Sequence, residues 1–191
     1  MKYSDVTGFV LAGGKSKRLG RDKRILRLWK ETLLERTWKL LNELIGSEPL
    51  IVGDNLSSLG LNPRSIIADA LPGRGPLSGL VASLGYCPSS WGLVLAVDMP
   101  LLRKTELRKL LDNMDDDYDV VALSINETPE PLAALYHRRK YSFWRERLFR
   151  GQLSIRDGIR NLEWKAVMLD KNSVAVSNLN NPEDIDNILR G

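Results

Sequence analysis

A short apolar strand that opens into a glycine-containing, basic loop constrains the fold of this chain more than any other segment. Residues 7–12 predict a strand, and Gly13 and Gly14 follow it directly. Glycine lets backbone N–H groups approach a ligand closely, and Arg18 and Lys23 add positive charge. Ligands of α/β folds bind at the carboxyl ends of the strands. The segment therefore predicts a phosphate-binding loop, suited to a triphosphate, at the carboxyl edge of a sheet.

The spacing within this loop excludes two common phosphate-binding motifs. A Walker A loop places four residues between its first glycine and Gly-Lys-Ser/Thr. Here five residues separate Gly14 from Gly20, and Arg21 and Asp22 follow. The dinucleotide-binding fingerprint G-x-G-x-x-G is also absent. The loop therefore belongs to neither of these classes.

Short apolar runs alternate with helical patterns along the chain, which predicts an α/β fold with a mostly parallel sheet. Strands are expected at residues 7–12, 50–53, 65–68, 92–97, 119–124, 131–137, 165–169 and 175–176. Helices are expected from the capping box at Thr32 to Gly46, at residues 76–84, 105–114, 141–149 and 154–161, and from Asn181 onward. Nearby prolines leave open an antiparallel or edge position for the strand 131–137.

The length and composition fit one globular domain that spans residues 1–191, with 43% hydrophobic and 27% charged residues. The net charge of +4 suits a small anionic substrate. No nucleic-acid partner is expected, because the chain lacks a lysine-rich arm and interleaved aromatic and basic residues. A single cysteine, Cys87, indicates a reducing compartment, and no apolar run is long enough to cross a membrane. We therefore expect a cytoplasmic location and no membrane partner.

Asp98 is the strongest candidate for a metal ligand. It follows the almost continuously apolar run 92–97, which predicts a central strand buried on both faces, and Pro100 stops that strand. The carboxylate therefore lies at the carboxyl end of the strand, beside the predicted phosphate loop. Mg²⁺ prefers oxygen ligands and shares its coordination shell with substrate phosphates. Alone, Asp98 fits a turn or a helix cap equally well; together with the loop, it is predicted to hold Mg²⁺.

Other conspicuous residues have simpler explanations. The acidic run 115–117 lacks the glycine and terminal glutamate of a calcium loop, and we expect it to be solvated. His137 is the only histidine, and because no G-x-S-x-G motif is present we expect a structural role for it. Cys87 is expected to be a small apolar residue of a helix rather than a nucleophile, and the tryptophans are expected to serve packing rather than base stacking.

Several segments resemble the MobA family of molybdenum cofactor guanylyltransferases. Residues 11–23, LAGGKSKRLGRDK, resemble the LAGGxSxRxGxDK signature of nucleotidyltransferases that activate small molecules with an NTP. Residues 69–80, DALPGRGPLSGL, resemble the family's aspartate followed by a GPLAG-like motif. Residues 178–184, NLNNPED, resemble NxNTPED, with Asn181 in place of threonine. Residues 130–136 and 151–157 are similar to family segments that line the acceptor half of the site.

The resemblance implies a single-domain three-layer α/β sandwich of the nucleotide-diphospho-sugar transferase type, with a mostly parallel, Rossmann-like sheet and helices on both faces. It implies transfer of GMP from GTP to molybdenum-molybdopterin, with Mg²⁺ as cofactor. The implied catalytic residues are Arg18, Lys23 and Asp98; the implied GTP-binding residues are Leu11, Ala12, Gly13, Lys23, Asp69 and Asp98; Gly75, Asn178 and Asn180 are candidates for further substrate contacts. For the two asparagines, a local backbone role is an equally good interpretation.

The resemblance also implies protein partners: other proteins of molybdenum cofactor biosynthesis, and acceptor molybdoenzymes or their chaperones. Three alternatives stay open from the sequence. A related nucleotidyltransferase could use another base or acceptor, such as a cytidylyltransferase of the same cofactor or a sugar-phosphate enzyme. A nucleotide-binding regulator could keep the pocket without turnover. RNA binding through the basic surface is the weakest of the three, and steep salt dependence would support it.

Overall fold

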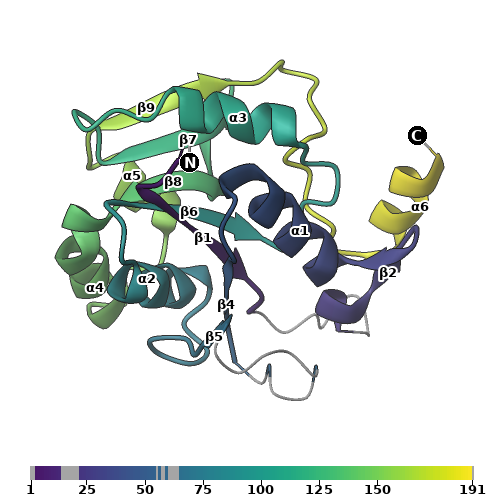
Figure 1. Ribbon diagram of the computed structural model, residues 1–191, viewed down its shortest axis with the longest axis horizontal. Coiled ribbons are helices and arrows are strands. Elements are labelled where there is room, and N and C mark those ends of the chain that lie inside the picture. Colours follow the sequence, from purple (N-terminus) through teal and green to yellow (C-terminus); the bar gives the residue numbers. More distant parts are fainter. Residues whose placement is uncertain (1–2, 14–21, 55, 57–58, 60–64, 191) are drawn as a thin grey trace.

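A seven-stranded sheet in the order β5-β4-β1-β6-β8-β7-β9 forms the centre of the computed structural model (Figure 1), which describes residues 3–13, 22–54, 56, 59 and 65–190. Its strands are β1 (Val6–Leu11), β4 (Leu50–Val52), β5 (Ile66–Ile67), β6 (Trp91–Ala96), β7 (Val120–Ile125), β8 (Thr128–His137) and β9 (Trp164–Met168). A separate hairpin is formed by β2 (Arg27–Leu28) and β3 (Glu31–Thr32). Strands β5, β4, β1 and β6 are parallel to their neighbours in that run, and β7 is parallel to β9. The predicted mostly parallel sheet is confirmed.

Strand β8 is the antiparallel member of the sheet, and it lies in the interior between β6 and β7. An edge position, one of the placements left open for it, is therefore wrong. The prolines are tolerated because the pairing with β6 runs only from His137 to Ala133, so Pro129 and Pro131 lie beyond it. On the other side, the register to β7 shifts between Ala122 and Ser124. Proline can occupy such positions because no regular ladder hydrogen bond is required there.

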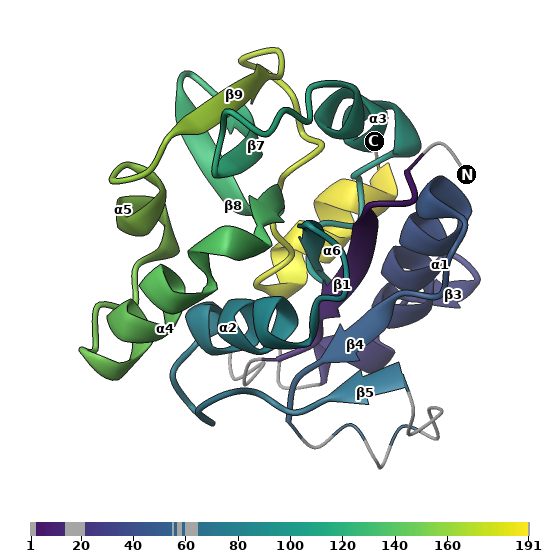
Figure 2. The same cartoon turned by 60° about the vertical axis from the view of Figure 1, so that its left-hand side comes forward.

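Helices cover both faces of the sheet (Figure 2). Helices α1 (Leu33–Ile45) and α3 (Lys104–Asp112) pack on one face, and α2 (Pro76–Tyr86), α4 (Tyr141–Phe149) and α5 (Ile155–Ile159) pack on the other. Successive strand side chains alternate between the two cores. In β1, Val10 joins the core under α1, whereas Phe9 and Leu11 join the core under α2. This two-residue period produces the predicted three-layer arrangement.

Local sequence signals fix helix α1 as expected. The Thr32 hydroxyl accepts a hydrogen bond from the Glu35 N–H at 3.1 Å, and the Glu35 carboxylate accepts one from the Thr32 N–H at 2.8 Å. Gly46 ends the helix in the left-handed conformation, with φ of 72°. The final helix, α6 (Pro182–Arg190), starts as predicted, because the Asn181 side chain accepts from the Asp184 N–H.

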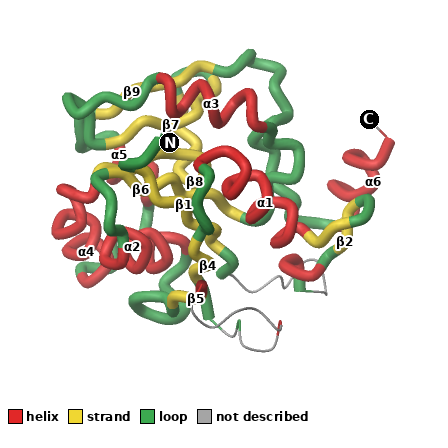
Figure 3. The backbone as a smooth tube through the Cα atoms, viewed as in Figure 1, coloured by secondary structure: helices red, strands yellow, loops and turns green. Residues whose placement is uncertain are grey.

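The predicted strand at residues 175–176 does not form. Figure 3 shows the segment between β9 and α6 as a loop. The Ser177 N–H donates to the Val174 carbonyl at 3.0 Å, which closes a turn over these residues. Their apolar side chains reflect packing against the core under α1 rather than a place in the sheet. In the part of the chain that the structure describes, no helix has both the length and the apolar content to cross a bilayer.

Candidate active site

The carboxyl ends of β1, β4 and β6 meet at one edge of the sheet. The Ala12 N–H donates to the Val52 carbonyl at 2.8 Å, and the Val97 N–H donates to the Leu11 carbonyl at 3.3 Å. These hydrogen bonds continue the pairing of the sheet one residue beyond the strands, so the backbone before Gly13 is fixed in position. Leu11 and Ala12 are buried and Gly13 is partly exposed. The three residues predicted to meet the nucleotide therefore lead from the sheet interior to its surface.

Lys23 and Asp98 form a hydrogen-bonded ion pair at this edge. The Lys23 Nζ lies 2.6 Å from the Asp98 Oδ2, although the residues are 75 positions apart. Their side chains are 16% and 13% exposed, so the pair is mostly shielded from water. Ion pairs in such surroundings are screened much less than surface pairs. The structure therefore brings together two of the three residues predicted to be catalytic; Arg18, the third, lies outside the described residues.

A short 3₁₀ turn, η1 (Lys23–Ile25), presents Lys23 to Asp98. Asp22 caps this turn by accepting a hydrogen bond from the Arg24 N–H at 3.0 Å, and its carboxylate also pairs with the Arg24 guanidinium. The guanidinium donates in turn to the Asp54 carbonyl at 2.9 Å, beyond the end of β4. In the sequence, the only signal for Asp54 is its position directly after the strand predicted at residues 50–53. The turn that carries Lys23 is thus tied to the neighbouring strand end.

The chemistry of Asp98 fits a divalent cation. Its Oδ1 is buried and has no hydrogen-bond partner among the described residues, since Lys23 reaches only Oδ2. A buried carboxylate oxygen without a partner is costly unless a ligand satisfies it. No group of three or more histidine, cysteine, aspartate or glutamate side chains among the described residues is arranged to hold a metal ion. An Mg²⁺ ion at Asp98 would therefore complete its shell with substrate oxygens and water.

The backbone of the predicted asparagine motif, residues 178–184, is hydrogen-bonded to the backbone of Asp98. The Leu179 N–H donates to the Asp98 carbonyl oxygen at 2.7 Å. Leu179 itself is fully buried, whereas Asn178 and Asn180 on either side of it are exposed. The Asn180 N–H donates to the Asp184 carboxylate at 2.7 Å, which fixes the start of α6. The structure thus brings both asparagines to the Asp98 edge, while their contact with substrate stays a prediction.

Asp69 lies at the other end of the site, between β1 and α2. A side-chain carbon built on Gly13 would lie 3.4 Å from the Asp69 Oδ2, and one built on Gly79 would lie 3.3 Å from Oδ1. Both glycines therefore let the backbone approach this carboxylate closely. Burial, and then the charge of Asp54, raise the pKa of Asp69 from its ordinary 3.8 to about 6. Near neutral pH the ionised group can accept hydrogen bonds from a base.

The predicted glycine-proline motif forms a compact loop before α2. The Leu71 N–H donates to the Ser78 hydroxyl at 2.7 Å, and the Ser78 N–H donates to the Gly75 carbonyl at 3.1 Å. Gly75 is exposed and has φ of 70°, a conformation that other residues rarely adopt, and Pro76 follows at the first helical position. The conformation explains the glycine, and its predicted substrate contact stays a prediction.

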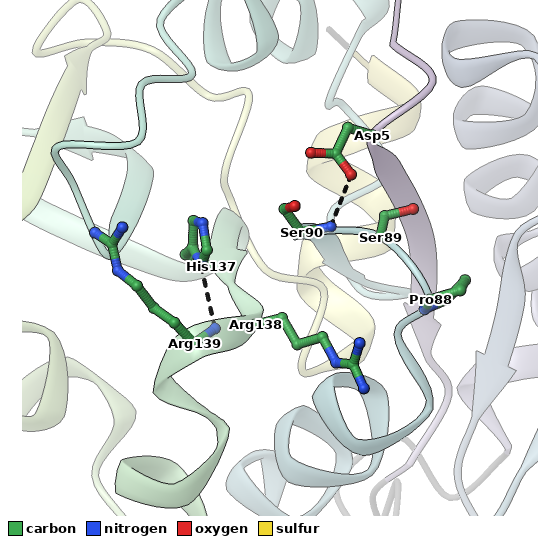
Figure 4. A pocket seen from close by; sticks show the side chains of 7 residues that line it. All are labelled: Asp5, Pro88, Ser89, Ser90, His137, Arg138 and Arg139. Atoms are coloured by element: carbon green, nitrogen blue, oxygen red, sulfur yellow. Dashed lines mark hydrogen bonds between the residues drawn. The ribbon is translucent and has the colours of Figure 1, made fainter.

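A hollow of about 360 Å³ lies at the opposite edge of the sheet (Figure 4). It is lined by Asp5, Pro88, Ser89, Ser90, His137, Arg138 and Arg139. Asp5 precedes β1, Ser90 precedes β6 and His137 ends the antiparallel β8, so the predicted site residues that the structure describes lie away from it. The His137 Nδ1 accepts from the Arg139 N–H at 3.1 Å, and its ring packs edge-on against Trp91. These contacts agree with a structural role for the histidine.

Comparisons with known proteins agree with this geometry. A family model described as "MobA-like NTP transferase domain" matches residues 8–164. A protein of Chloroflexus aggregans named "Probable molybdenum cofactor guanylyltransferase" is 32% identical over 192 residues, covering 94% of this chain and 91% of its own length. A protein of Opitutus terrae with the same name is 33% identical over 192 residues, covering 96% and 94%. The crystal structure of "Molybdopterin-guanine dinucleotide biosynthesis protein A" from Archaeoglobus fulgidus superposes with a TM-score of 0.78 at 24% identity, covering 95% of each chain, and so has the same fold.

Proposed function

The chain belongs to the family of MobA-like NTP transferase domains and is a nucleotidyltransferase, and on that premise we propose that it transfers GMP from GTP to the terminal phosphate of molybdenum-molybdopterin. The products would be molybdopterin guanine dinucleotide and pyrophosphate. The observation that carries the proposal is the shielded Lys23–Asp98 pair at the carboxyl edge, with an Asp98 Oδ1 that has no hydrogen-bond partner among the described residues. The names of the relatives supply the base and the acceptor.

The reaction is an in-line substitution at the α-phosphorus of GTP. An oxygen of the acceptor phosphate forms a bond to the α-phosphorus, and the bond from that phosphorus to the bridging oxygen of the β-phosphate breaks. Pyrophosphate leaves with the electron pair. A phosphate monoester is already ionised near neutral pH, so the nucleophile needs no general base. Catalysis therefore depends on positioning the two phosphates and on neutralising their charge.

The residues at the edge of the sheet suit these two tasks. Lys23 would donate to phosphate oxygens, and the η1 turn holds its side chain at the site before substrate arrives. Asp98 would hold Mg²⁺, which when bound neutralises and orients the phosphate oxygens. Arg18 is proposed to add positive charge on the leaving pyrophosphate.

The base would lie at the opposite end of the site, against Leu11, Ala12, Gly13 and Asp69. Guanine presents its N1–H and 2-amino donors side by side, and an ionised carboxylate can accept both. Cytosine and adenine each present one amino group at the corresponding edge. Asp69, held next to Gly13 and Gly79, is thus the proposed group that favours GTP.

Thermal stability measured with GTP, ATP, CTP and UTP, each with and without Mg²⁺, tests the base. A ligand at 100 times its Kd adds about 2.7 kcal/mol to the free energy of unfolding, which a melting curve resolves easily. Stabilisation by GTP alone is expected, whereas stabilisation by CTP alone would indicate the cytidylyltransferase. Pyrophosphate release with the molybdopterin acceptor then tests turnover. Nucleotide binding without release would favour a regulator.

The remaining expectations are part of the same proposal. Residues 1–191 would act as one nucleotidyltransferase domain with GTP and molybdopterin as small-molecule substrates. Other proteins of molybdenum cofactor biosynthesis, and acceptor molybdoenzymes or their chaperones, are the proposed protein partners. A cytoplasmic location, without nucleic-acid or membrane partners, is proposed from the composition.

A further inference from the structure

Glu130 on β8 and Asp98, which follows β6, lie at the same end of the antiparallel strand pair β6–β8. The pairing runs without a break from Trp91 with His137 to Leu95 with Ala133. Asp98 lies three residues after Leu95, and Glu130 lies three residues before Ala133. The two chain segments therefore leave the paired region at the same end of the sheet.

The electrostatics of Glu130 show that Asp98 is close to it. Their electrostatic interaction agrees with this position, because the charge of Asp98 contributes, after burial, to raising the pKa of Glu130.

The negative charge of Glu130 is poorly compensated by the protein. Its side chain is 15% exposed, and the cation paired with it among the described residues, the Arg156 Nη2, is 3.9 Å from its Oε2. Arg156 is itself 45% exposed, and its Nε donates to the Pro129 carbonyl at 3.2 Å. The Leu132 N–H supplies one hydrogen bond to Oε1 at 3.2 Å. Within the part of the chain that the structure describes, one long ion pair and one backbone hydrogen bond thus serve a mostly buried carboxylate.

The carboxylate of Asp98, at the same end of the strand pair, also has an oxygen that lacks a hydrogen-bond partner among the described residues. Its Oδ1 is buried and has no partner among the described residues, and the residue as a whole is 9% exposed. Lys23 neutralises only the side of Asp98 that carries Oδ2. The phosphates of two substrates would bring more negative charge to these carboxylates. A divalent cation is the ligand that meets all these demands, because it binds hard oxygen donors and phosphates together.

We propose that Glu130 is the second carboxylate of the divalent-cation site, which it forms with the Asp98 Oδ1. The inference rests on the proposed function only in one respect, namely that substrate phosphates would bind the same cation. The cation site itself is a property of the unliganded protein. Asp98 contributes from the end of β6 and Glu130 from β8, so the site joins the nucleotide half of the sheet to its antiparallel half.

Mn²⁺ binding to the unliganded protein, followed by electron paramagnetic resonance of the free ion, tests the proposal without any activity measurement. The wild type is expected to bind Mn²⁺, and Glu130→Gln to weaken that binding about 10- to 100-fold, as found for supporting residues of metal sites. Glu146→Gln, which removes an exposed carboxylate on α4, is the matched control and should bind as the wild type does. Unchanged affinity in Glu130→Gln, or no binding by the wild type, would overturn the proposal.

A second variant separates a metal ligand from an anchor for Arg156. If Glu130 served only to hold Arg156, then Arg156→Gln would weaken Mn²⁺ binding as much as Glu130→Gln does, and the proposal would be wrong. A ligand role predicts that Arg156→Gln keeps the affinity or strengthens it, because the competing cation is gone. Melting curves in EDTA check that each variant folds. The GTP selectivity of the wild type is measured separately, so failure of the proposed function stays distinguishable from failure of the cation site.

Discussion

At the scale of single residues, the site depends on carboxylates whose surroundings differ sharply. Among the described residues, Asp98 pairs with Lys23 and keeps one oxygen without a hydrogen-bond partner, whereas no cation offsets the burial of Asp69. The first arrangement leaves one carboxylate oxygen available to a cation, and in the second, burial and then the charge of Asp54 raise the pKa of the carboxyl to about 6. Two aspartates at one sheet edge are thereby suited to different tasks, cation binding and recognition of the base.

Replacing Asp98 should abolish transfer without unfolding the protein. We expect Asp98→Ala to lower kcat by at least about 100-fold, the loss typical when a group that stabilises transition-state charge is removed. Asp98→Asn keeps the shape and should lose nearly as much, because the amide cannot replace the charge. Pyrophosphate release is measured at matched Mg²⁺, and circular dichroism checks the fold. Normal turnover by either variant would contradict the assignment.

The raised pKa of Asp69 predicts a pH dependence of both stability and binding. The folded-state pKa of about 6 lies above the ordinary 3.8, so the folded protein holds this proton more tightly than the unfolded chain. The contribution of Asp69 to stability therefore falls as the pH rises from about 4 through 6. Asp69→Asn should melt higher than the wild type at pH 8, and the difference should shrink toward pH 4.

The affinity for GTP should depend on the ionisation of Asp69 in the opposite sense to stability, and should be higher at high pH. The ionised carboxylate accepts from guanine, so GTP affinity of the wild type should fall as the pH drops below about 6. Because the phosphates of GTP titrate in a similar range, the informative quantity is the difference between the wild type and Asp69→Asn. Calorimetric titrations at pH 5 and 8 measure it. Parallel pH profiles of the two proteins would exclude a role for Asp69 ionisation.

At the scale of elements, local sequence signals predict where helices begin and end, whereas contacts between distant elements cannot be predicted from them. Helix α1 begins at the capping box of Thr32 and ends at Gly46, as expected, because caps act within a few residues of the chain. The interior place of β8 depends on its pairing with β6 and β7, which no local pattern encodes. The placement of Glu130 at the same end of the sheet as Asp98 has the same origin, since it needs the pairing of two distant strands. The effect of the Asp54 charge on the pKa of Asp69 likewise acts through space, between residues that follow different strands.

The contact between α4 and α5 is a second feature that sequence patterns do not reveal. A side-chain carbon built on Gly158 would lie 2.4 Å from a ring carbon of Trp144, which is fully buried. Gly158→Ala should therefore displace the indole and destabilise the protein by about 1–3 kcal/mol, the usual cost of overpacking. This exceeds the gain of about 1 kcal/mol that alanine brings to a helix. Urea unfolding measures the change; equal or greater stability would show that Trp144 moves freely.

At the scale of the whole molecule, one sheet separates two apolar cores and supports the site at its edge. Leu41 packs in the core under α1, and Leu80 packs in the core under α2, yet both cores share the strands β1 and β6. The backbone bond from Leu179 to Asp98 ties the segment before α6 to the same edge. Neither core can lose its strands without exposing the other, so the two should unfold together.

Cooperative unfolding of the two cores is a testable consequence of this architecture. Leu41→Ala and Leu80→Ala should each destabilise the protein by about 2–5 kcal/mol, because each leaves a cavity beside the shared sheet. In urea, tryptophan fluorescence and far-ultraviolet circular dichroism should give one coincident transition for the wild type and for both variants. GTP with Mg²⁺ should shift all three transitions, since the site contains strand ends that both cores support. If Leu80→Ala instead separated the two signals, with GTP shifting only one, the site would belong to one half of the molecule, and residues 1–191 would not act as a single domain.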